Sequence, residues 1–373
     1  MFGTVLISLC TIIHIYIFWR ASSVPFLKKH IPLITLISAG LILWLIFYMG
    51  RVYGHNGTGF IARALEIAGM HWMGILFLTF VPLIATDLFS GFGFFLPGIA
   101  PSLRGWAMIA GCLLSLIALF QGLRPPVVDG FEVRIKGLPE KLDGTVIVAV
   151  SDLHIGSMIG RGWLEKRIEQ VQKLEPDLFV LLGDIFEGHG KPEQGLVEIL
   201  QRVKAPLGLW AVTGNHEFHG DIEENMSIIK NAGFGILRDR WVQIARGLIL
   251  AGVDDLTSRR RAGFKGDPVS SSLKDRPPGA TVLLSHTPWE ADRAAACGVN
   301  LMLSGHTHGG QIWPMGYLTR LSYPLMSGRY LIEGMTVIVC RGTGTWGPRM
   351  RLWKPGEILK ITLLRGDSQK EGP

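Results

Sequence analysis

Two histidines separated by a single residue, His306 and His308, have the spacing with the most obvious chemical use in this chain. They follow the largely apolar run 299–303 and precede two glycines, a pattern typical of a strand that ends in a tight turn. Two imidazoles held so close together suit a metal ion. Paired histidines also occur in surface loops and as hydrogen-bonded core residues, so the motif indicates a metal site only if the chain supplies further ligands.

Further ligands of this kind occur at the ends of four other strand-like runs. In chain order they are Asp152 and His154, Asp184, Asn215 and His216, and His286. Taken singly, each is commonly a helix cap, a turn residue or a hydrogen-bonded polar group. Caps and turns do not account for carboxylate, amide and imidazole side chains at five successive strand ends. The set therefore predicts a metal centre.

The runs between these strand ends predict the elements that position them. Apolar residues recur with helical spacing over 163–174, 193–203 and 222–231. The expected strands are 131–136, 145–150, 178–182, 207–212, 241–244, 248–253, 281–284 and 300–303. Strands that alternate with helices predict an α/β domain, in which ligands bind beyond the carboxyl ends of the strands.

The first 123 residues are much more apolar than the rest of the chain. Six basic and two acidic residues lie among them, out of 37 Lys and Arg and 30 Asp and Glu in the whole sequence. Stretches 3–19, 31–49, 67–86 and 105–123 each approach the roughly 20 apolar residues that cross a bilayer. A helical bundle buried inside a soluble protein is the alternative, but helices of soluble proteins normally keep a polar face. We therefore expect four transmembrane helices.

These features divide the chain into a membrane domain over 1–123, a linker over 124–130, a soluble α/β domain over 131–365 and a polar tail over 366–373. The pattern predicts a multi-pass protein of the cell membrane, and the loop charges do not decide on which side the soluble domain lies. The formal net charge of +7 is shared by both parts, so no nucleic-acid partner is expected. The four cysteines show no Cys-x-x-Cys spacing. No pattern indicates the oligomeric state.

The ordered set of strand-end residues resembles the calcineurin-like metallophosphoesterase superfamily. Segments 151–156, 252–255, 305–311 and 342–347 are similar to its bacterial membrane-associated branch, and the resemblance covers about residues 130–365. It implies a β-sandwich flanked by helices, in α/β/β/α layers, with two divalent metal ions at one edge. The implied ligands are Asp152, His154 and His308 for one ion and Asn215, His286 and His306 for the other, with Asp184 bridging the two and His216 as general acid.

Mixed carboxylate, imidazole and amide ligands suit Mn, Fe or Zn better than Cu(I) or Ca. Two such ions can clamp a phosphoryl group and lower the pKa of a bridging water. We therefore expect hydrolysis of a phosphoester, phosphodiester or pyrophosphate bond by attack of metal-bound hydroxide, with His216 protonating the leaving oxygen. The alternative role of His216 is a hydrogen bond to the bound phosphate.

The substrate is less constrained than the reaction. A membrane anchor favours the lipid bilayer as partner and a lipid or nucleotide-linked lipid as substrate, and a soluble phosphoester is the alternative. The segment 312–330 is apolar with scattered arginines, which fits either contact with the membrane or packing on the domain. Its prolines and glycines argue against a plain helix.

Other functions and side-chain roles stay open at this point. A non-catalytic metal-binding scaffold and a membrane transporter are alternative functions. Glu187 and Glu217 fit either support of the metal site or turns, and Arg259–Arg261 fit either an anionic substrate or a solvated loop. Asp254 and Asp255 follow a strand and have no derived role.

Overall fold

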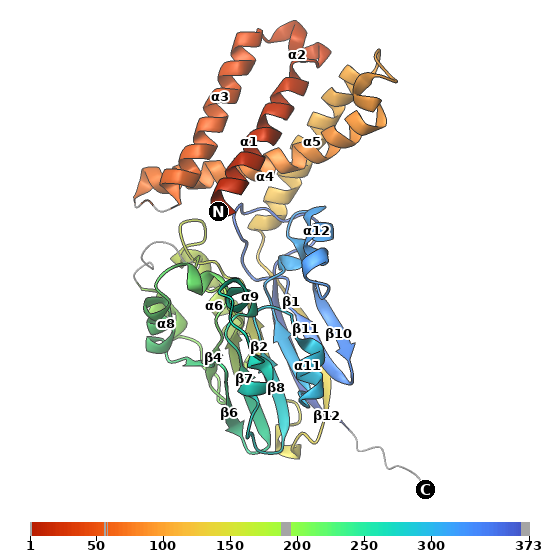
Figure 1. Ribbon diagram of the computed structural model, residues 1–373. Coiled ribbons are helices and arrows are strands. Elements are labelled where there is room, and N and C mark those ends of the chain that lie inside the picture. Colours follow the sequence, from red (N-terminus) through yellow and green to blue (C-terminus); the bar gives the residue numbers. More distant parts are fainter. Residues whose placement is uncertain (1, 56, 58, 188–194, 367–373) are drawn as a thin grey trace. The chain divides into compact units, whose positions relative to one another are not determined.

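The structure is a computed structural model that describes residues 2–55, 57, 59–187 and 195–366. It divides into two compact units (Figure 1). The helical unit comprises Met1–Arg124 together with Gly347–Trp353. The sandwich unit comprises Pro125–Trp346 and Lys354–Pro373.

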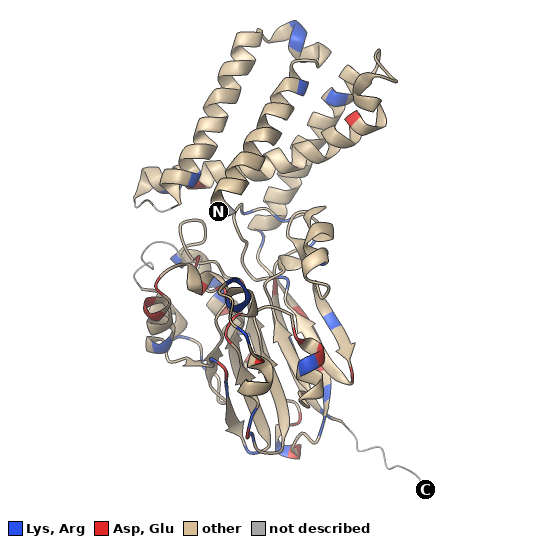
Figure 2. Cartoon of the chain, in the orientation of Figure 1, with Lys and Arg blue, Asp and Glu red and all other residues tan. Residues whose placement is uncertain are grey.

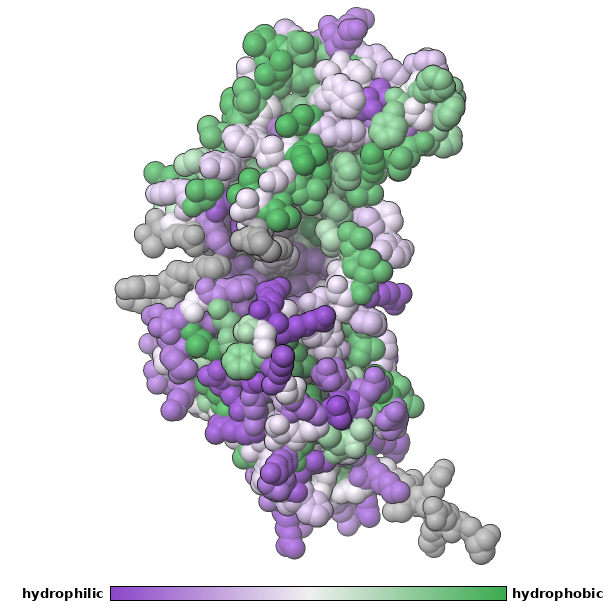
Figure 3. Space-filling view, viewed as in Figure 1, coloured by the Kyte–Doolittle hydropathy of each residue, from purple (hydrophilic) through white to green (hydrophobic). Residues whose placement is uncertain are grey.

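The helical unit contains four helices that are long and apolar enough to cross a membrane. They are α1 (Phe2–Ala21), α3 (Leu33–Met49) with its π-helical extension η1 (Gly50–Gly54), α4 (Phe60–Phe89) and α5 (Ala100–Leu123). Short helices α2 (Pro25–His30) and η2 (Gly91–Gly93) lie in the connections. Charged residues are sparse on these helices (Figure 2), and apolar residues cover most of their surface (Figure 3). The expected four membrane helices are confirmed.

A buried ionic cluster ties three of these helices together. Asp87 near the end of α4 is fully buried, forms an ion pair with Arg20 at 2.6 Å and accepts a hydrogen bond from Arg104 Nε at 2.8 Å. Tyr16 Oη donates to the same carboxylate at 2.5 Å. Charges inside a membrane domain are stable only when paired, so Asp87 joins α1, α4 and α5 rather than facing lipid headgroups.

Residues Gly347–Trp353 fall within the soluble domain expected from the sequence, yet they pack with the helices. Arg351 N donates to the Ala118 carbonyl of α5 at 2.8 Å, and the Arg351 side chain is buried. Gly122 permits this contact, because a Cβ at that position would lie 2.4 Å from the Arg349 carbonyl oxygen. Composition along the chain does not reveal that this seven-residue segment belongs with the helices, since its apolar partners lie far away in sequence.

Two six-stranded sheets form the sandwich unit. The first has the order β1 (Val127–Lys136), β12 (Glu357–Gly366), β2 (Val146–Val150), β3 (Leu178–Leu181), β4 (Leu209–Ala211) and β5 (Gly235–Ile236). The second has the order β10 (Gly328–Ile332), β11 (Met335–Val339), β9 (Leu301–Ser304), β8 (Ala280–Leu284), β7 (Leu248–Gly252) and β6 (Arg240–Ala245). Strands β2, β3 and β4 run parallel in one sheet, as do β7, β8, β9 and β11 in the other.

Helices cover the outer face of each sheet. The first sheet packs against α6 (Arg161–Gln172), α7 (Leu196–Leu200) and α8 (Ile222–Asn231) through one apolar cluster. The second packs against α9 (Leu256–Arg261), α10 (Pro268–Ser272) and α11 (Ala291–Ala296) through another. A third cluster, which includes Ile147 and Leu250, fills the space between the sheets. The α/β/β/α layering is therefore confirmed.

Several expected boundaries differ from the observed ones. The first strand begins at Val127, inside the expected linker, because it pairs in parallel with β12 over its whole length at the edge of the sheet. The helix expected over 193–203 is the shorter α7, and residues 193–194 lie outside the described residues, as does 367–373 of the expected tail. A helix, α12 (Met315–Ser322), forms in the segment where proline and glycine argued against one. Pro314 immediately precedes the helix, where a proline costs no hydrogen bond.

Candidate metal centre

The strand ends bring all eight predicted site residues to neighbouring turns. Asp152 and His154 follow β2, Asp184 follows β3, Asn215 and His216 follow β4, His286 follows β8, and His306 and His308 follow β9. The 3-10 turns η4 (His216–His219) and η5 (His308–Gly310) begin within this set. Carboxyl ends of parallel strands meet at one edge, which explains why residues far apart in sequence converge.

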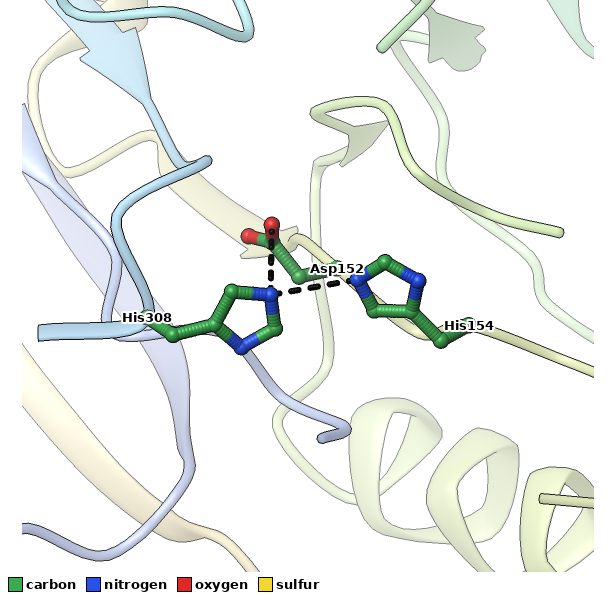
Figure 4. Close-up of side chains that lie close together, drawn as sticks. All are labelled: Asp152, His154 and His308. Atoms are coloured by element: carbon green, nitrogen blue, oxygen red, sulfur yellow. Dashed lines mark hydrogen bonds and ion pairs between the residues drawn. The ribbon is translucent and has the colours of Figure 1, made fainter. Parts of the chain in front are cut away.

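One group consists of Asp152, His154 and His308, whose side chains point toward one another (Figure 4). The Nε2 atoms of His154 and His308 are 3.1 Å apart, and His308 Nε2 lies 3.3 Å from Asp152 Oδ1. His154 Nδ1 lies 3.0 Å from the Glu187 carboxylate. Since that carboxylate accepts a hydrogen bond from Nδ1–H, the lone pair of His154 is left on Nε2, facing His308.

A second group is built around Asp184. Its Oδ2 atom lies 3.2 Å from His286 Nε2 and 3.8 Å from His154 Nε2, so it stands between the two groups. His306 Nδ1 lies 3.3 Å from His286 Nε2. His286 Nδ1 bonds the Leu182 carbonyl oxygen at 2.7 Å, and because a carbonyl only accepts, the proton is on Nδ1 and Nε2 is free to bind a cation.

Asn215 and His216 lie beside Asp184. The His216 backbone N–H donates to Asp184 Oδ1 at 2.8 Å, and the His216 ring centroid is 4.6 Å from that of His154. Asn215 Oδ1 is buried and has no hydrogen-bond partner among the described residues. A buried amide oxygen without a donor is costly, and a cation would satisfy it.

These donors fit divalent metal ions. Ring nitrogens with free lone pairs face each other and face carboxylate oxygens at distances of 3.1 to 3.8 Å. Lone pairs converge in this way only where a proton or a cation lies between them. The donor set supports a dinuclear divalent site, whereas the division of ligands between two ions stays a prediction.

Backbone conformation singles out the same residues. Asp152, His154, Asp184, His306 and His308 all have positive φ, between 48° and 71°. Non-glycine residues in this region are uncommon and cost about 1 kcal/mol or more each. Such strain recurs at functional sites, where the surrounding structure fixes side-chain directions that relaxed turns would not give.

Glu217 supports two of these turns, a role that the sequence left undecided. Its side chain is fully buried, and its two oxygens accept the backbone N–H groups of Asp184, Ile185, Phe186 and Gly214 at 2.6 to 3.2 Å. Gly214 is required for this packing, because a Cβ there would lie 2.2 Å from Asp184 Oδ1. Glu217 therefore fixes the Gly183-Asp184 and Gly214-Asn215 turns in one arrangement.

Asp255 links two further turns, a role that no local sequence signal revealed. Its buried carboxylate accepts from Thr287 Oγ1 and from the Ser258 backbone N–H, both at 2.6 Å. Its own N–H donates to Thr213 Oγ1 at 3.2 Å. Thr287 follows His286 directly, so Asp255 joins the turn that carries His286 to the end of β4.

The electrostatics of the site call for positive charge. Burial lowers the pKa of His154, but Glu187 and Asp184 outweigh burial and raise it to about 9. Burial also opposes the charged form of His286, yet Asp184 holds the pKa of that imidazole well above its usual range. Burial and the charge of His286 lower the pKa of His306 to about 3. The buried carboxylates thus favour positive charge at this site, and divalent cations would supply it.

Comparison with known proteins agrees with this geometry. The sequence model of the calcineurin-like phosphoesterase family matches residues 145–310. A metallophosphoesterase of Aquifex aeolicus whose function is uncharacterized is 33% identical over 244 residues, which cover 63% of this chain and 91% of that protein. This chain belongs to the calcineurin-like phosphoesterase family. An uncharacterized metallophosphoesterase of Helicobacter pylori is 30% identical over 302 residues, 77% of this chain and 80% of its own length.

Relatives of this metallophosphoesterase also include membrane proteins. A transmembrane protein with metallophosphoesterase domain from Danio rerio is 32% identical over 269 residues, 69% of this chain. The chain spans about three-fifths of the length of this relative and of its Bos taurus counterpart, 62% and 61%. Bacterial and animal relatives therefore share the metallophosphoesterase domain that contains the strand-end residues.

Proposed function

We propose that this protein is a membrane-anchored, dinuclear-metal phosphoesterase that hydrolyses a phosphoester, phosphodiester or pyrophosphate bond. The observation that carries the proposal is the convergence of His154, His308, His286 and His306 nitrogens on Asp152 and Asp184, with the unsatisfied Asn215 oxygen beside them. The four apolar helices support a multi-pass location, which we place in the cell membrane.

Asp152, His154 and His308 would hold one ion, and Asn215, His286 and His306 the other, with Asp184 shared. When bound, two divalent ions such as Mn, Fe or Zn supply charge that stabilises a phosphoryl group and acidifies water. Glu187, by its contact with His154 Nδ1, and the Leu182 carbonyl, by its contact with His286 Nδ1, direct the Nε2 lone pairs inward.

His216 is the proposed proton donor to the leaving oxygen. Its Nδ1 lies 3.0 Å from the Glu187 carbonyl oxygen, which only accepts, so Nδ1 keeps its proton and Nε2 exchanges one. The ring is buried, and its centroid lies 4.6 Å from that of His154 and 6.3 Å from that of Trp346. A fixed ring with one exchangeable nitrogen suits transfer to a single substrate atom.

A lipid substrate is supported by the surface of α12. Tyr317, Leu318 and Leu321 on this helix are 69%, 61% and 82% exposed. The helix begins seven residues after His308, and apolar residues that face solvent next to a site favour contact with acyl chains or a bilayer. Leu325 does not belong to this surface, because it packs against the core of the second sheet.

The central experiment uses the full chain in detergent, stripped of metal and reloaded with Mn. It should hydrolyse bis(4-nitrophenyl) phosphate, and Asp184→Asn should not. His216→Ala should keep its metal and lose about 10²- to 10⁴-fold in kcat on an ester with an alkyl leaving group, with a smaller loss on an aryl ester. Equal losses on both esters would contradict the proton-donor role. Failure to turn over any ester with Mn, Fe or Zn would favour a non-catalytic scaffold.

A second experiment tests the lipid proposal. Leu318→Asp combined with Leu321→Asp should lower turnover of a phospholipid in mixed micelles more than turnover of bis(4-nitrophenyl) phosphate. Leu331→Asp is the matched control, because Leu331 is 73% exposed but lies on β10. A soluble substrate is favoured if the double variant loses the same fraction of activity on both compounds.

A further inference from the structure

Two arginines at the end of α9, Arg260 and Arg261, are exposed. The preceding Arg259 serves the fold, since it pairs with Asp239 and lies 3.7 Å from Asp254. Within the part of the chain that the structure describes, no carboxylate forms an ion pair with Arg260 or Arg261. Their guanidinium groups are therefore available to an external anion.

Aromatic contacts connect Arg260 to the metal centre. The Arg260 guanidinium carbon is 5.3 Å from the ring centroid of Trp289. Trp289 stacks on Tyr323 with centroids 5.2 Å apart and rings at 14°. Tyr323 in turn contacts His306 edge-on at 4.6 Å. Trp289 and Tyr323, which we call the aromatic shelf, therefore connect the predicted metal ligand His306 to the Arg260 guanidinium.

The shelf is held rigidly. Trp289 Nε1 donates to the Ser322 carbonyl at 3.1 Å, which fixes the indole against the end of α12. Asp255 caps α9 through the Ser258 N–H and also binds Thr287, two residues before Trp289. The buried carboxylate of Asp255 therefore fixes the positions of both the helix that carries the arginines and the loop that carries Trp289.

Arg261 follows Arg260 in the last turn of α9, so both guanidinium groups start from the same end of this helix.

We propose that Arg260 and Arg261, together with the aromatic shelf, form a subsite for a second phosphate group of the substrate. The inference rests on the proposed function, because the phosphoester that reacts lies at the metal centre. Guanidinium groups bind phosphate through charge-assisted hydrogen bonds, and the adjacent rings bind the substrate portion between the two phosphates. The substrate class is a phosphodiester that carries an additional phosphate at a separate position.

Position alone gives these arginines another use, since basic residues in the last turn stabilise a helix C-terminus. That role predicts no dependence of catalysis on the substrate's charge. Two matched esters separate the roles: thymidine 5′-(4-nitrophenyl phosphate) and the same compound with a 3′-phosphate. The full chain loaded with Mn should show kcat/KM about tenfold higher for the 3′-phosphorylated ester, through KM, as one charge-assisted hydrogen bond would give.

Substitution and salt then test the residues. Combined Arg260→Gln and Arg261→Gln should bring the ratio of the two kcat/KM values close to one, and Lys274→Gln, an exposed change of the same charge, should leave it unaltered. Raising NaCl from about 0.05 M to about 0.5 M should shrink the ratio in the wild type only.

The outcomes are distinguishable. Equal kcat/KM for both esters in the wild type, or an unchanged ratio in the double variant, overturns the subsite and leaves the phosphoesterase proposal intact. Absence of hydrolysis of either ester with Mn, Fe and Zn overturns both.

Discussion

Replacement of Glu217 by glutamine should disable the metal centre without changing the size of the side chain. One carboxylate oxygen accepts from the N–H groups of Ile185 and Phe186 at 2.8 and 3.2 Å. The other accepts from Asp184 and Gly214 at 3.0 and 2.6 Å. Glutamine keeps one acceptor and turns an NH₂ group toward the other pair of donors, so two buried N–H groups lose their partner.

The expected loss follows from these contacts. A buried donor left unpaired costs about 1–3 kcal/mol, so Glu217→Gln should lower the free energy of unfolding by about 2–6 kcal/mol. The same change frees the turns that carry Asp184 and Asn215. Metal affinity should therefore fall together with stability. If the Glu217 side chain only filled space, glutamine would lower neither of them.

Denaturant unfolding of the full chain and metal content after dialysis measure the two effects. Glu224→Gln is the matched control, since Glu224 is exposed in the first turn of α8 and its loss should cost less than about 1 kcal/mol. If Glu217→Gln unfolds within about 1 kcal/mol of the wild type and keeps its metal, the carboxylate does not organise the site and the reasoning fails.

Three further predictions concern other parts of the sandwich unit. Asp255→Ala removes two hydrogen bonds of 2.6 Å and should cost about 2–4 kcal/mol in denaturant unfolding and weaken metal binding in calorimetry; normal values for both would contradict the linking role. Burial raises the pKa of Glu357 from 4.5 to about 8, so its contribution to stability is complete below pH 4.5 and is lost as pH rises toward 8. Glu357→Gln should abolish that loss in melting curves, and an unchanged pH slope would refute the assignment. Removal of metal with a chelator should lower the melting temperature of the wild type but not of Asp184→Asn, and equal shifts would place the metal elsewhere.

Local sequence patterns were sufficient for the membrane helices and for the strand ends. Both depend on residues close together in the chain: apolar stretches of bilayer length, and buried runs that stop at Asp184 or His286. The predicted ligands converge because parallel strands end at one edge, which is a property of the fold class.

Long-range pairing accounts for what the sequence did not show. The first four residues of strand β1, 127–130, were expected in the linker because its partner β12 lies more than 200 residues later. The burial of Asp87 between two arginines likewise depends on how three helices pack. No role for Tyr323 or Trp289 was apparent from the sequence, since nothing nearby in sequence indicates that Tyr323 contacts His306.

The most direct test of the metal centre is a titration of the metal-free full chain with Mn, followed by the rate of bis(4-nitrophenyl) phosphate hydrolysis. Because Asp184 joins two groups of ligands, we expect two ions per chain. Activity should therefore rise with added Mn and level off near two equivalents per chain. Saturation at one equivalent, or no activity at any ratio, would contradict a dinuclear phosphoesterase.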